Sequence, residues 1–472
     1  MIRFLSAHFP RRTVFLVLSE ACLIALTFCL ASVARLGKTD ASLMLNYEQG
    51  FWKILILTSA VILCMYYFDL YDSSILRNSR EVFTRLIQVL GIMSMVLACV
   101  YYVNPSLELG RGIVLIGLVI ASIALAIWRR LFLAINAFTQ LAERTVIFGD
   151  EPTASKLMQE LQRRPELGLA VIGRILAIGD GTHELHFERA TDREELLGTI
   201  SDRDLTDVIT SQRVKRIIVA LDDRRGRLPV KEFLSMKSTG TRIQDGFEFY
   251  EQVTGKIPIE SLRLSFLLFS SGFHLSQFLL VYKRLASVVI STIGLILSLP
   301  LLPFVAIAIK LSSPGPLFYH QKRVGKNESI FYCHKFRTMR ADAEADSGPT
   351  WAGDHDPRIT LVGRFLRGTR LDEIPQLWNV LKGEMSFVGP RPERPEFTEW
   401  LKQAIPFYSL RETVRPGITG WAQTRYKYGN SVEDAKKKLR YDLFYIKNMS
   451  PGLDALILFN TVKTILLGRG AR

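Results

Sequence analysis

The sequence predicts a membrane protein in three parts: a bundle of transmembrane helices, a Rossmann-like α/β domain, and a mixed α/β domain anchored by a re-entrant helix. Three observations support this prediction. Four long apolar segments fill the first third of the chain, apolar strands alternate with amphipathic helices in the middle, and a proline-broken apolar segment opens the last part. The parts are expected at residues 1–135, 143–255 and 283–472, joined by a connector at 256–282.

The composition agrees with a membrane protein that has large soluble parts. Hydrophobic residues make up 48% of the 472 residues and charged residues 22%. The formal net charge of +15 is typical of proteins that meet an anionic membrane face, phosphate-bearing substrates or nucleic acid. The hydrophobic spans favour the first two classes over nucleic acid. The five cysteines have no metal-site spacing.

Four transmembrane helices are predicted near residues 13–34, 51–70, 84–103 and 113–133, because each has about the 20 apolar residues that a bilayer core requires. Arginines gather before the first helix, between the second and third, and after the fourth. The positive-inside rule then places everything after residue 130 in the cytoplasm of a multi-pass inner-membrane protein. Glu20 lies inside the first helix, where it could be functional or could simply face another helix.

The middle part reads as a parallel, doubly wound α/β sheet. Strands are predicted at residues 145–149, 169–178 and 216–221, and helices at 153–164 and 229–239. A dinucleotide site would require G-x-G-x-x-G after the first strand, but the chain continues from Gly149 as Asp-Glu-Pro-Thr-Ala. We therefore expect a structural or regulatory domain that is degenerate for nucleotide binding, with a working nucleotide site as the alternative.

The apolar segment at residues 283–310 could span a bilayer, but Pro300 and Pro303 interrupt it. Both of its ends are basic, so the positive-inside rule favours a cytoplasmic position for both. A re-entrant helix that breaks at Pro300 satisfies this rule. The alternative is a fifth transmembrane helix.

Two adjacent carboxylates, Asp372 and Glu373, precede Pro375 and a run with helical spacing. Such a pair at a helix N-terminus can hold a divalent cation and leave one carboxylate for attack or proton transfer. Arginines on both sides add the cations that phosphoryl chemistry requires. A capped helix with surface salt bridges explains the pair equally well.

Further cations lie within a predicted strand at residues 332–339 and within a later Gly/Pro-rich loop. Lys335 and Arg337 should share one strand face, which suits a pyrophosphate or an ordinary solvated edge. Arg415 lies in the loop at 414–423, and together with Lys335 and Arg337 it is a candidate for binding phosphate or substrate.

Several ordered motifs resemble the signature of the bacterial sugar transferase family, the monotopic phosphoglycosyl transferases. They lie at residues 335–339, 356–359, 371–373, 376–379, 387–392 and 415–421, and read Lys-Phe-Arg-Thr-Met, Asp-Pro-Arg-Ile, Leu-Asp-Glu, Gln-Leu-Trp-Asn, Phe-Val-Gly-Pro-Arg-Pro and Arg-Pro-Gly-Ile-Thr-Gly-Trp. The two N-terminal parts look like those of the long members, which initiate exopolysaccharide or O-antigen repeat units. Residues 255–263 and 269–273 are similar to the exopolysaccharide subgroup associated with PEP-CTERM sorting systems.

The resemblance implies transfer of a hexose-1-phosphate from a UDP-sugar to undecaprenyl phosphate, with release of UMP. Asp372 would be the nucleophile with Mg²⁺ bound beside it, and Glu373 would complete the catalytic pair. The phosphates would be held by Lys335, Arg367 and Arg391, and Pro300 would set the break in the re-entrant helix. UDP-glucose or UDP-galactose is the expected donor, and a homodimer is plausible.

Two departures from the family pattern affect the membrane anchor: Leu299 replaces a serine before Pro300, and Ser287 replaces an acidic residue. Two other functions remain open. One is a metal-dependent glycosyltransferase that uses Asp354 and Asp356 and releases UDP. The other is a non-catalytic membrane scaffold of a polysaccharide machine.

Overall fold

The structure is a computed structural model of the whole chain. It forms two compact units, Ile2–Phe249 and Tyr250–Arg472, which are described separately. The described residues are 11–72, 75, 79–137, 142–150, 153–164, 167–179, 182–188, 194–221, 223–262, 272–273, 276–340, 343, 356–426, 429 and 431–467.

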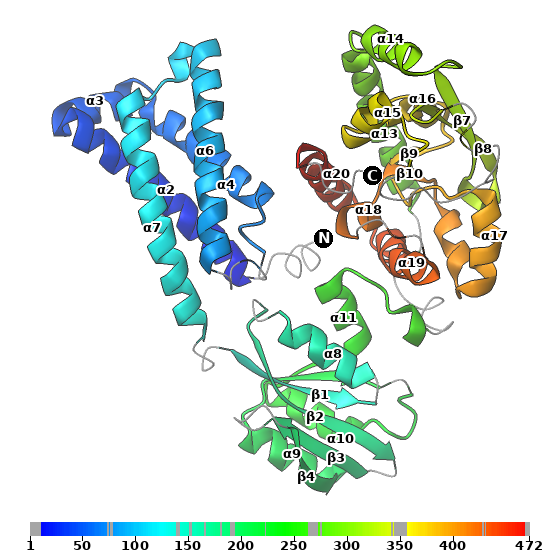
Figure 1. Cartoon of the computed structure of the whole chain (residues 1–472). Coiled ribbons are helices and arrows are strands. Elements are labelled where there is room, and N and C mark those ends of the chain that lie inside the picture. Colours follow the sequence, from blue (N-terminus) through cyan, green and yellow to red (C-terminus); the bar gives the residue numbers. More distant parts are fainter. Residues whose placement is uncertain are drawn as a thin grey trace. The chain divides into compact units, whose positions relative to one another are not determined.

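The first unit begins with the predicted helical bundle, drawn from blue to cyan in Figure 1. Its long helices are α2 (Arg11–Leu36), α4 (Gly50–Tyr67), α6 (Ser79–Val103) and α7 (Arg111–Ala137). Across the described residues, five helices are long and apolar enough to cross a membrane, namely these four and a later one. A short helix that was not predicted, α3 (Lys38–Tyr47), follows α2 and buries Ala41 and Met44.

A buried ion pair joins α2 to α7. The Arg129 guanidinium donates from Nε to Oε1 of Glu20 at 2.6 Å and from Nη2 to Oε2 at 3.0 Å. Its Nη1 donates to the Leu70 carbonyl at 3.0 Å, and its plane lies over the Tyr71 ring. Glu20 is fully buried. Of the two possibilities left open for Glu20, the structure therefore supports a contact with a facing helix.

The second half of this unit is a six-stranded sheet in the order β4-β3-β2-β1-β5-β6. The strands are β1 (Glu143–Gly149), β2 (Leu169–Gly179), β3 (Thr182–Glu188), β4 (Glu194–Ser201), β5 (Arg216–Ala220) and β6 (Arg242–Asp245). The predicted strands are present, and β1, β2, β5 and β6 are parallel. The prediction missed β6 and the antiparallel pair β3 and β4. The sequence Thr-His-Glu-Leu-His-Phe-Glu of β3 alternates polar and apolar residues and lacks the apolar run of a central strand.

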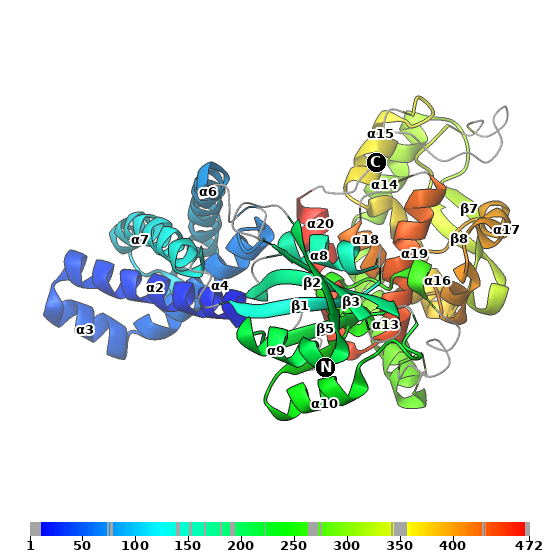
Figure 2. The same cartoon turned by 90° about the horizontal axis from the view of Figure 1, so that it is seen from below.

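Helices cover both faces of this sheet. Leu205 of α9 (Asp202–Ser211) and Phe233 of α10 (Val230–Ser238) share a buried cluster with Val146 and Phe148 of β1. Helix α8 (Thr153–Gln162) packs against β1 and β2 from the opposite face, as Figure 2 shows. Helix α11 (Gly246–Thr254) follows β6.

An internal ion pair lies at the carboxyl ends of β1 and β2, where a dinucleotide would bind in a Rossmann fold. The Arg227 guanidinium contacts both the Asp150 carboxylate and the Ala177 carbonyl. Gly149 lies so close to β5 that an added Cβ would be 2.3 Å from the Ala220 carbonyl oxygen. The glycine therefore serves strand packing here. That this domain is degenerate for nucleotide binding remains a prediction.

The second unit surrounds two short sheets. The hairpin β7 (Phe318–Val324) and β8 (Ile330–Phe336) is antiparallel, and β9 (Ser386–Val388) pairs in parallel with β10 (Gly417–Thr419). The helices that follow β9 are α17 (Pro395–Ala404), α18 (Trp421–Arg425), α19 (Val432–Lys447) and α20 (Pro451–Leu466). Figure 1 draws this unit from green to red.

The predicted broken helix consists of α13 (Gln277–Ser298) and α14 (Leu302–Ser312). The interruption falls on residues 299–301, around Pro300, and Pro303 lies in the first turn of α14. The helix begins at Gln277, six positions before residue 283, where the sequence analysis placed its start. Many apolar side chains of both arms are exposed; examples are Leu285, Val289, Ile293, Leu297 and Phe304.

Both arms pack against the same unit. Gly294 of α13 lies against Leu377, and an added Cβ would be 3.1 Å from it. Val305 and Ile309 of α14 share a buried cluster with Phe336 of β8. The residues before and after the interruption are therefore attached to one body.

Polar side chains fix the first turns of α13. Lys283 donates to Asp454 at 2.7 Å and also contacts the Tyr445 hydroxyl. Arg284 donates to the carbonyls of Val380 and Leu381. Both carbonyls lie in the last turn of α16 (Gln376–Lys382), so the guanidinium caps the C-terminal end of that helix.

The departure at Ser287 has a structural role. The Ser287 hydroxyl lies 3.1 Å from the Ser386 hydroxyl and accepts a hydrogen bond from the Phe387 amide at 3.1 Å. A serine at this position therefore attaches α13 to β9 without an acidic group.

Residues 250–262 belong to the second unit. The Trp421 indole donates to the Gly255 carbonyl at 2.9 Å, and the Ile257 amide donates to the Arg440 carbonyl. Glu251 accepts from Lys447 and Asn448. The chain is thus tied to α18 and α19 before α13 begins.

We expect Glu20→Ala to destabilise the protein by about 3–5 kcal/mol, because it leaves the buried Arg129 guanidinium without its carboxylate. Thermal unfolding of the detergent-purified protein measures this loss. The matched control is Glu81→Ala, whose partner Arg85 forms a half-exposed pair worth at most about 1 kcal/mol. Equal losses for the two variants would contradict a structural role for the buried pair.

Candidate active site

The two carboxylates predicted from the sequence lie in a tight turn between two helices. Helix α15 (Leu361–Gly368) is followed by the 3-10 turn η6 (Leu371–Glu373), and α16 (Gln376–Lys382) begins after Pro375. Arg370 adopts a left-handed backbone conformation at φ 61°, which reverses the chain before the turn. Asp372 and Glu373 are both buried, with exposed fractions of 6% and 8%. The alternative of surface salt bridges therefore does not hold.

Three cations converge on one oxygen of Glu373. Its Oε1 lies 2.8 Å from Nη2 of Arg391, 3.2 Å from Nζ of Lys335 and 3.7 Å from Nη1 of Arg370. Burial alone would raise the pKa of Glu373, but Arg391, Lys335 and Arg370 outweigh burial and hold this pKa well below its usual range. Glu373 is therefore ionised at neutral pH.

Asp372 is in a different state from its neighbour. Its Oδ1 atom is buried and has no hydrogen-bond partner among the described residues. Burial and the adjacent Glu373 charge raise the pKa of Asp372, while Lys335, Arg367 and Arg391 oppose that rise. A buried oxygen without a partner is a candidate for binding a cation or for attacking an electrophile.

Of the two cations predicted on one face of β8, the strand brings Lys335 to the carboxylates. Phe331 and Cys333 are buried in a cluster with Val380 and Met385, and Lys335 continues their face toward Glu373. Asn379 fixes this register, because its side chain accepts from the His334 amide at 3.0 Å and donates to the Tyr332 carbonyl at 2.7 Å.

The structure does not bring Arg337 to the carboxylates through its described contacts. The strand ends at Phe336, so the predicted alternation does not extend to the next arginine. The Arg337 guanidinium is buried and donates to the carbonyls of Ser313 and Pro314. It anchors the turn that follows α14.

The other two predicted cations lie in different surroundings. Arg367 of α15 donates from Nε to the Thr338 hydroxyl at 2.9 Å, and its charge acts on Asp372. Arg415 is exposed and lines a pocket of about 380 Å³ beside the first turns of α13. Arg367 therefore belongs to the carboxylate site, and Arg415 lines a separate pocket.

The alternative metal motif can be followed only in part. Asp354 lies outside the described residues. Arg358 donates two hydrogen bonds to the Asp356 carboxylate, from Nη2 to Oδ2 at 2.6 Å and from Nε to Oδ1 at 2.8 Å. Hydrogen bonds from Arg358 lower the pKa of Asp356 despite its burial. This carboxylate is therefore already engaged by a cation of the chain.

The donor set limits which metal the site can hold. Among the described residues there is no group of three or more histidine, cysteine or acidic side chains placed to bind an ion. Three cations lie on Oε1 of Glu373, whereas Oδ1 of Asp372 has no hydrogen-bond partner among the described residues and could contribute to a metal site. Mg²⁺ fits such a site, since it keeps several waters and often takes one or two carboxylates together with substrate phosphates.

Sequence reasoning missed the residues behind this site. Asn379 was included in a motif without a role, and Arg411 and Asp442 were not singled out. Arg411 and Asp442 form a buried ion pair at 3.0 Å next to the loop that carries Arg391. Their separation of about 30 positions offers no short-range pattern that could have linked them.

Comparison with known proteins agrees with this geometry. A family model described as bacterial sugar transferase matches residues 278–468, and one described as a CoA-binding domain matches residues 66–227. A UDP-N-acetylgalactosamine-undecaprenyl-phosphate N-acetylgalactosaminephosphotransferase of Aeromonas hydrophila is 43% identical over 222 residues, which are 47% of this chain. The aligned segment spans about half, 52%, of the length of that relative.

Two further relatives are covered more fully. A UDP-glucose:undecaprenyl-phosphate glucose-1-phosphate transferase of Klebsiella pneumoniae is 35% identical over 331 residues, which are 68% of this chain and 67% of the relative. The exopolysaccharide production protein PSS of Rhizobium leguminosarum bv. phaseoli is 42% identical over 197 residues, which are 40% of this chain and 98% of the relative. The chain therefore belongs to the bacterial sugar transferase family.

Proposed function

We propose that the chain transfers a hexose-1-phosphate from a UDP-sugar to undecaprenyl phosphate and releases UMP. The observation that supports this most strongly is that Oδ1 of Asp372 has no hydrogen-bond partner within the described part of the chain, beside an ionised Glu373 that contacts three cations. The relative from Klebsiella pneumoniae, of which 67% is covered, is named as a transferase of glucose-1-phosphate from UDP-glucose to undecaprenyl phosphate. The reaction would open the membrane stage of exopolysaccharide or O-antigen assembly.

The reaction proceeds in two displacements at one phosphorus atom. Asp372 Oδ1 attacks the phosphorus that carries the sugar, the bond to the bridging oxygen breaks, and UMP leaves with that oxygen. An oxygen of undecaprenyl phosphate then attacks the same phosphorus and displaces the Asp372 carboxylate, which yields the diphosphate-linked lipid. The covalent intermediate allows the soluble donor and the lipid acceptor to use the site in turn.

The chain's own residues supply the charge that the displacements require. Lys335 and Arg391 form ion pairs with Glu373, and the charge of Arg367 on α15 lowers the pKa of Asp372. Positive groups fixed in place stabilise the negative charge that builds on the phosphoryl oxygens. Glu373 holds two of these cations beside the nucleophile, so its role is to keep them positioned.

Mg²⁺ is the cofactor that this donor set would take, with the Asp372 carboxylate as its protein ligand. When bound it would neutralise charge on the diphosphate of the donor.

The membrane arrangement proposed with this function is a re-entrant α13 and α14. Both arms are attached to one body, and a globular body cannot lie on both sides of a bilayer. Basic residues flank both ends, including Lys283 and Lys310. The exposed apolar side chains of both arms would then lie in one leaflet of the inner membrane, and Asp372 would face the cytoplasm at the level of the lipid phosphates.

The identity of the hexose stays open within this proposal. The sequence favoured UDP-glucose or UDP-galactose, whereas the named relatives act on UDP-glucose or on UDP-N-acetylgalactosamine. These donors share the uridine diphosphate, so the site described here serves all of them.

Membranes that contain the protein should release UMP when supplied with undecaprenyl phosphate, Mg²⁺ and one of a panel of UDP-sugars. Asp372→Asn keeps the side-chain size but removes the nucleophile, and should lower UMP release by about 10³-fold or more. Asp356→Asn is the control and should retain release. Release of UDP, lost in Asp356→Asn, would favour the metal-dependent glycosyltransferase, and unchanged UMP release by Asp372→Asn would contradict the nucleophile.

The pH dependence should report the raised pKa of Asp372. The carboxylate attacks only when ionised, so kcat/KM should fall with decreasing pH through a pKa above the ordinary aspartate value. Lys335 lowers the pKa of Asp372, so Lys335→Met should move this acid limb to higher pH.

Lys436→Met is the control for this shift, because Lys436 pairs with Glu260 in the same unit. It should leave the position of the acid limb unchanged. An unchanged acid limb in Lys335→Met, or an equal shift in both variants, would contradict the assignment.

Topology can be tested with single cysteines in a variant that lacks the five native ones. A membrane-impermeant maleimide should label Tyr47→Cys in intact spheroplasts, because the segment after the first helix is expected outside. Glu399→Cys on α17 should react only after permeabilisation. Labelling of Glu399→Cys in intact spheroplasts would show that the α13 segment crosses the membrane.

A further inference from the structure

The loop that carries Arg391 is held by its carbonyl groups. Two prolines flank the arginine and have no amide hydrogen to donate, so the carbonyls are the main hydrogen-bonding groups of this segment. Four consecutive carbonyls each accept a hydrogen bond, Pro390 from the Gly417 amide at 2.8 Å, Arg391 from Arg411 Nη2 at 2.8 Å, Pro392 from Arg323 Nη1 at 3.0 Å and Glu393 from the Val324 amide at 3.0 Å.

The donor to the Arg391 carbonyl is itself held in a buried network. The same Nη2 atom of Arg411 lies 3.0 Å from Oδ2 of Asp442, and its Nη1 lies 2.5 Å from the Tyr408 hydroxyl. Glu393 is a more distant partner at 3.9 Å. Arg411 and Asp442 are buried to 9% and 3% side-chain exposure. The Arg411 guanidinium is therefore held in place by these partners, because a buried guanidinium that loses its partners strongly destabilises the fold.

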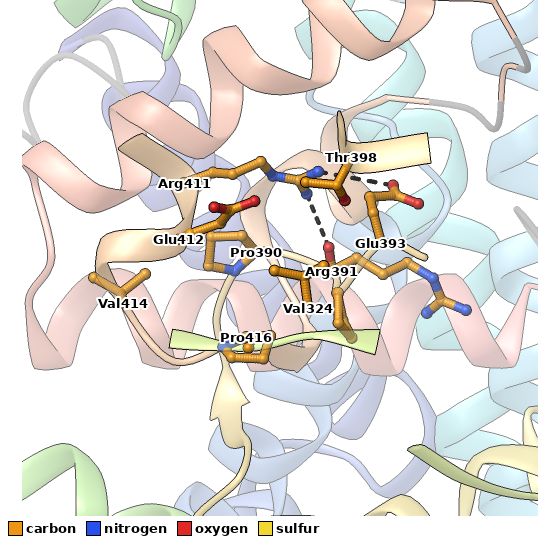
Figure 3. A pocket seen from close by; sticks show the side chains of 11 residues that line it. Val324, Pro390, Arg391, Glu393, Thr398, Arg411, Glu412, Val414 and Pro416 are labelled. Carbon is orange, nitrogen blue, oxygen red and sulfur yellow. Dashed lines mark hydrogen bonds and ion pairs between the residues drawn. The ribbon is translucent and has the colours of Figure 1, made fainter. Parts of the chain in front are cut away.

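Figure 3 shows the two arginines on either side of the loop. The Arg411 guanidinium is joined to the Glu393 carboxylate and to the Arg391 backbone oxygen, and lines a small pocket. The Arg391 side chain points away from this pocket, and its Nη2 reaches Oε1 of Glu373 at 2.8 Å. One backbone carbonyl therefore links the buried ion pair to the cation of the active site.

Asp442 carries the charge that this arrangement requires. Its neighbours Arg411 and Lys438 favour the ionised form, whereas burial and Glu393 oppose it. Burial is the larger effect and raises the pKa of Asp442 to about 6. The carboxylate is thus ionised at pH 7 to 8, where transfer would be measured.

We infer that Arg411, held by Asp442, is a positioning residue that fixes the backbone of Arg391 so that its guanidinium reaches Glu373. The catalytic consequence rests on the proposed function, while the structural link does not. Arg411 does not touch the carboxylate pair through any described contact. Its effect on transfer passes through Arg391.

A double-mutant cycle separates this role from a general loss of stability. Arg411→Lys keeps a positive charge beside Asp442. Its single nitrogen cannot replace both Nη2, which serves Asp442 and the Arg391 carbonyl, and Nη1, which contacts Tyr408. We expect this variant to lower kcat/KM by about 30-fold, in line with the cost of small misplacements in active sites. In the Arg391→Ala background, the same substitution should lower kcat/KM by less than about twofold, because the group that Arg411 positions is gone.

Hydrogen exchange measures the structural link without any activity. In Arg411→Lys, exchange at the Gly389 and Gly417 amides, which bond across the loop and β10, should be about tenfold faster than in the wild-type chain. The control is Lys447→Met, which removes a buried ion pair with Glu251 in the same unit. Lys447→Met should not accelerate exchange at these two amides selectively. In the kinetic cycle, its fold loss in kcat/KM should multiply with the loss caused by Arg391→Ala.

The outcomes divide cleanly. Unchanged exchange at the two glycines in Arg411→Lys, or an equal acceleration in Lys447→Met, would overturn the inference. Independent, multiplying losses for Arg411→Lys and Arg391→Ala would also overturn it. Absence of UMP release by the wild-type protein would contradict the proposed function instead, and the exchange measurement would still decide whether Arg411 holds the loop.

Discussion

The candidate site depends on a balance between burial and charge at two adjacent carboxylates. Removing two negative charges from water is costly unless cations compensate them. The chain places its closest cations on Glu373, and among the described residues one oxygen of Asp372 has no hydrogen-bond partner. The two groups therefore differ although their side chains are alike. Glu373 is stabilised as an anion that organises cations, whereas Asp372 has what the proposed nucleophile requires, a buried oxygen without a hydrogen-bond partner among the described residues.

The fold brings those cations together from three separate places. Lys335 comes from a hairpin, Arg370 from the turn before the carboxylates, and Arg391 from a loop bracketed by prolines. The segments that carry two of them are held by other side chains: Asn379 bonds to β8, which carries Lys335, and Arg411 bonds to the Arg391 carbonyl. The same unit also attaches both arms of the apolar helix. The carboxylate site therefore belongs to the same body that holds both α13 and α14.

Local sequence chemistry predicted much of this arrangement. Apolar length identified the membrane helices, strand alternation placed Lys335 on the correct face, and Pro300 marked the interruption between α13 and α14. The same alternation failed for Arg337, because a periodic argument does not indicate where the strand ends. The missed strands β3 and β4 carry too many polar residues to resemble buried strands.

What the sequence could not indicate is contact between distant positions. Nothing in the spacing of Lys335, Arg370 and Arg391 shows that they meet on one oxygen of Glu373. The link from Asp442 through Arg411 to the Arg391 carbonyl is equally invisible, because it passes through a backbone atom. Such relations depend on how the chain returns to the same place, and only a three-dimensional structure contains that information.

The most direct test of this account is mass spectrometry of the protein after brief exposure to its UDP-sugar and Mg²⁺ without the lipid acceptor. The account predicts a hexose-phosphate adduct on the peptide that contains Asp372, its loss when undecaprenyl phosphate is added, and its absence in Asp372→Asn. An adduct on another residue, or sugar transfer without any adduct and with release of UDP, would contradict it.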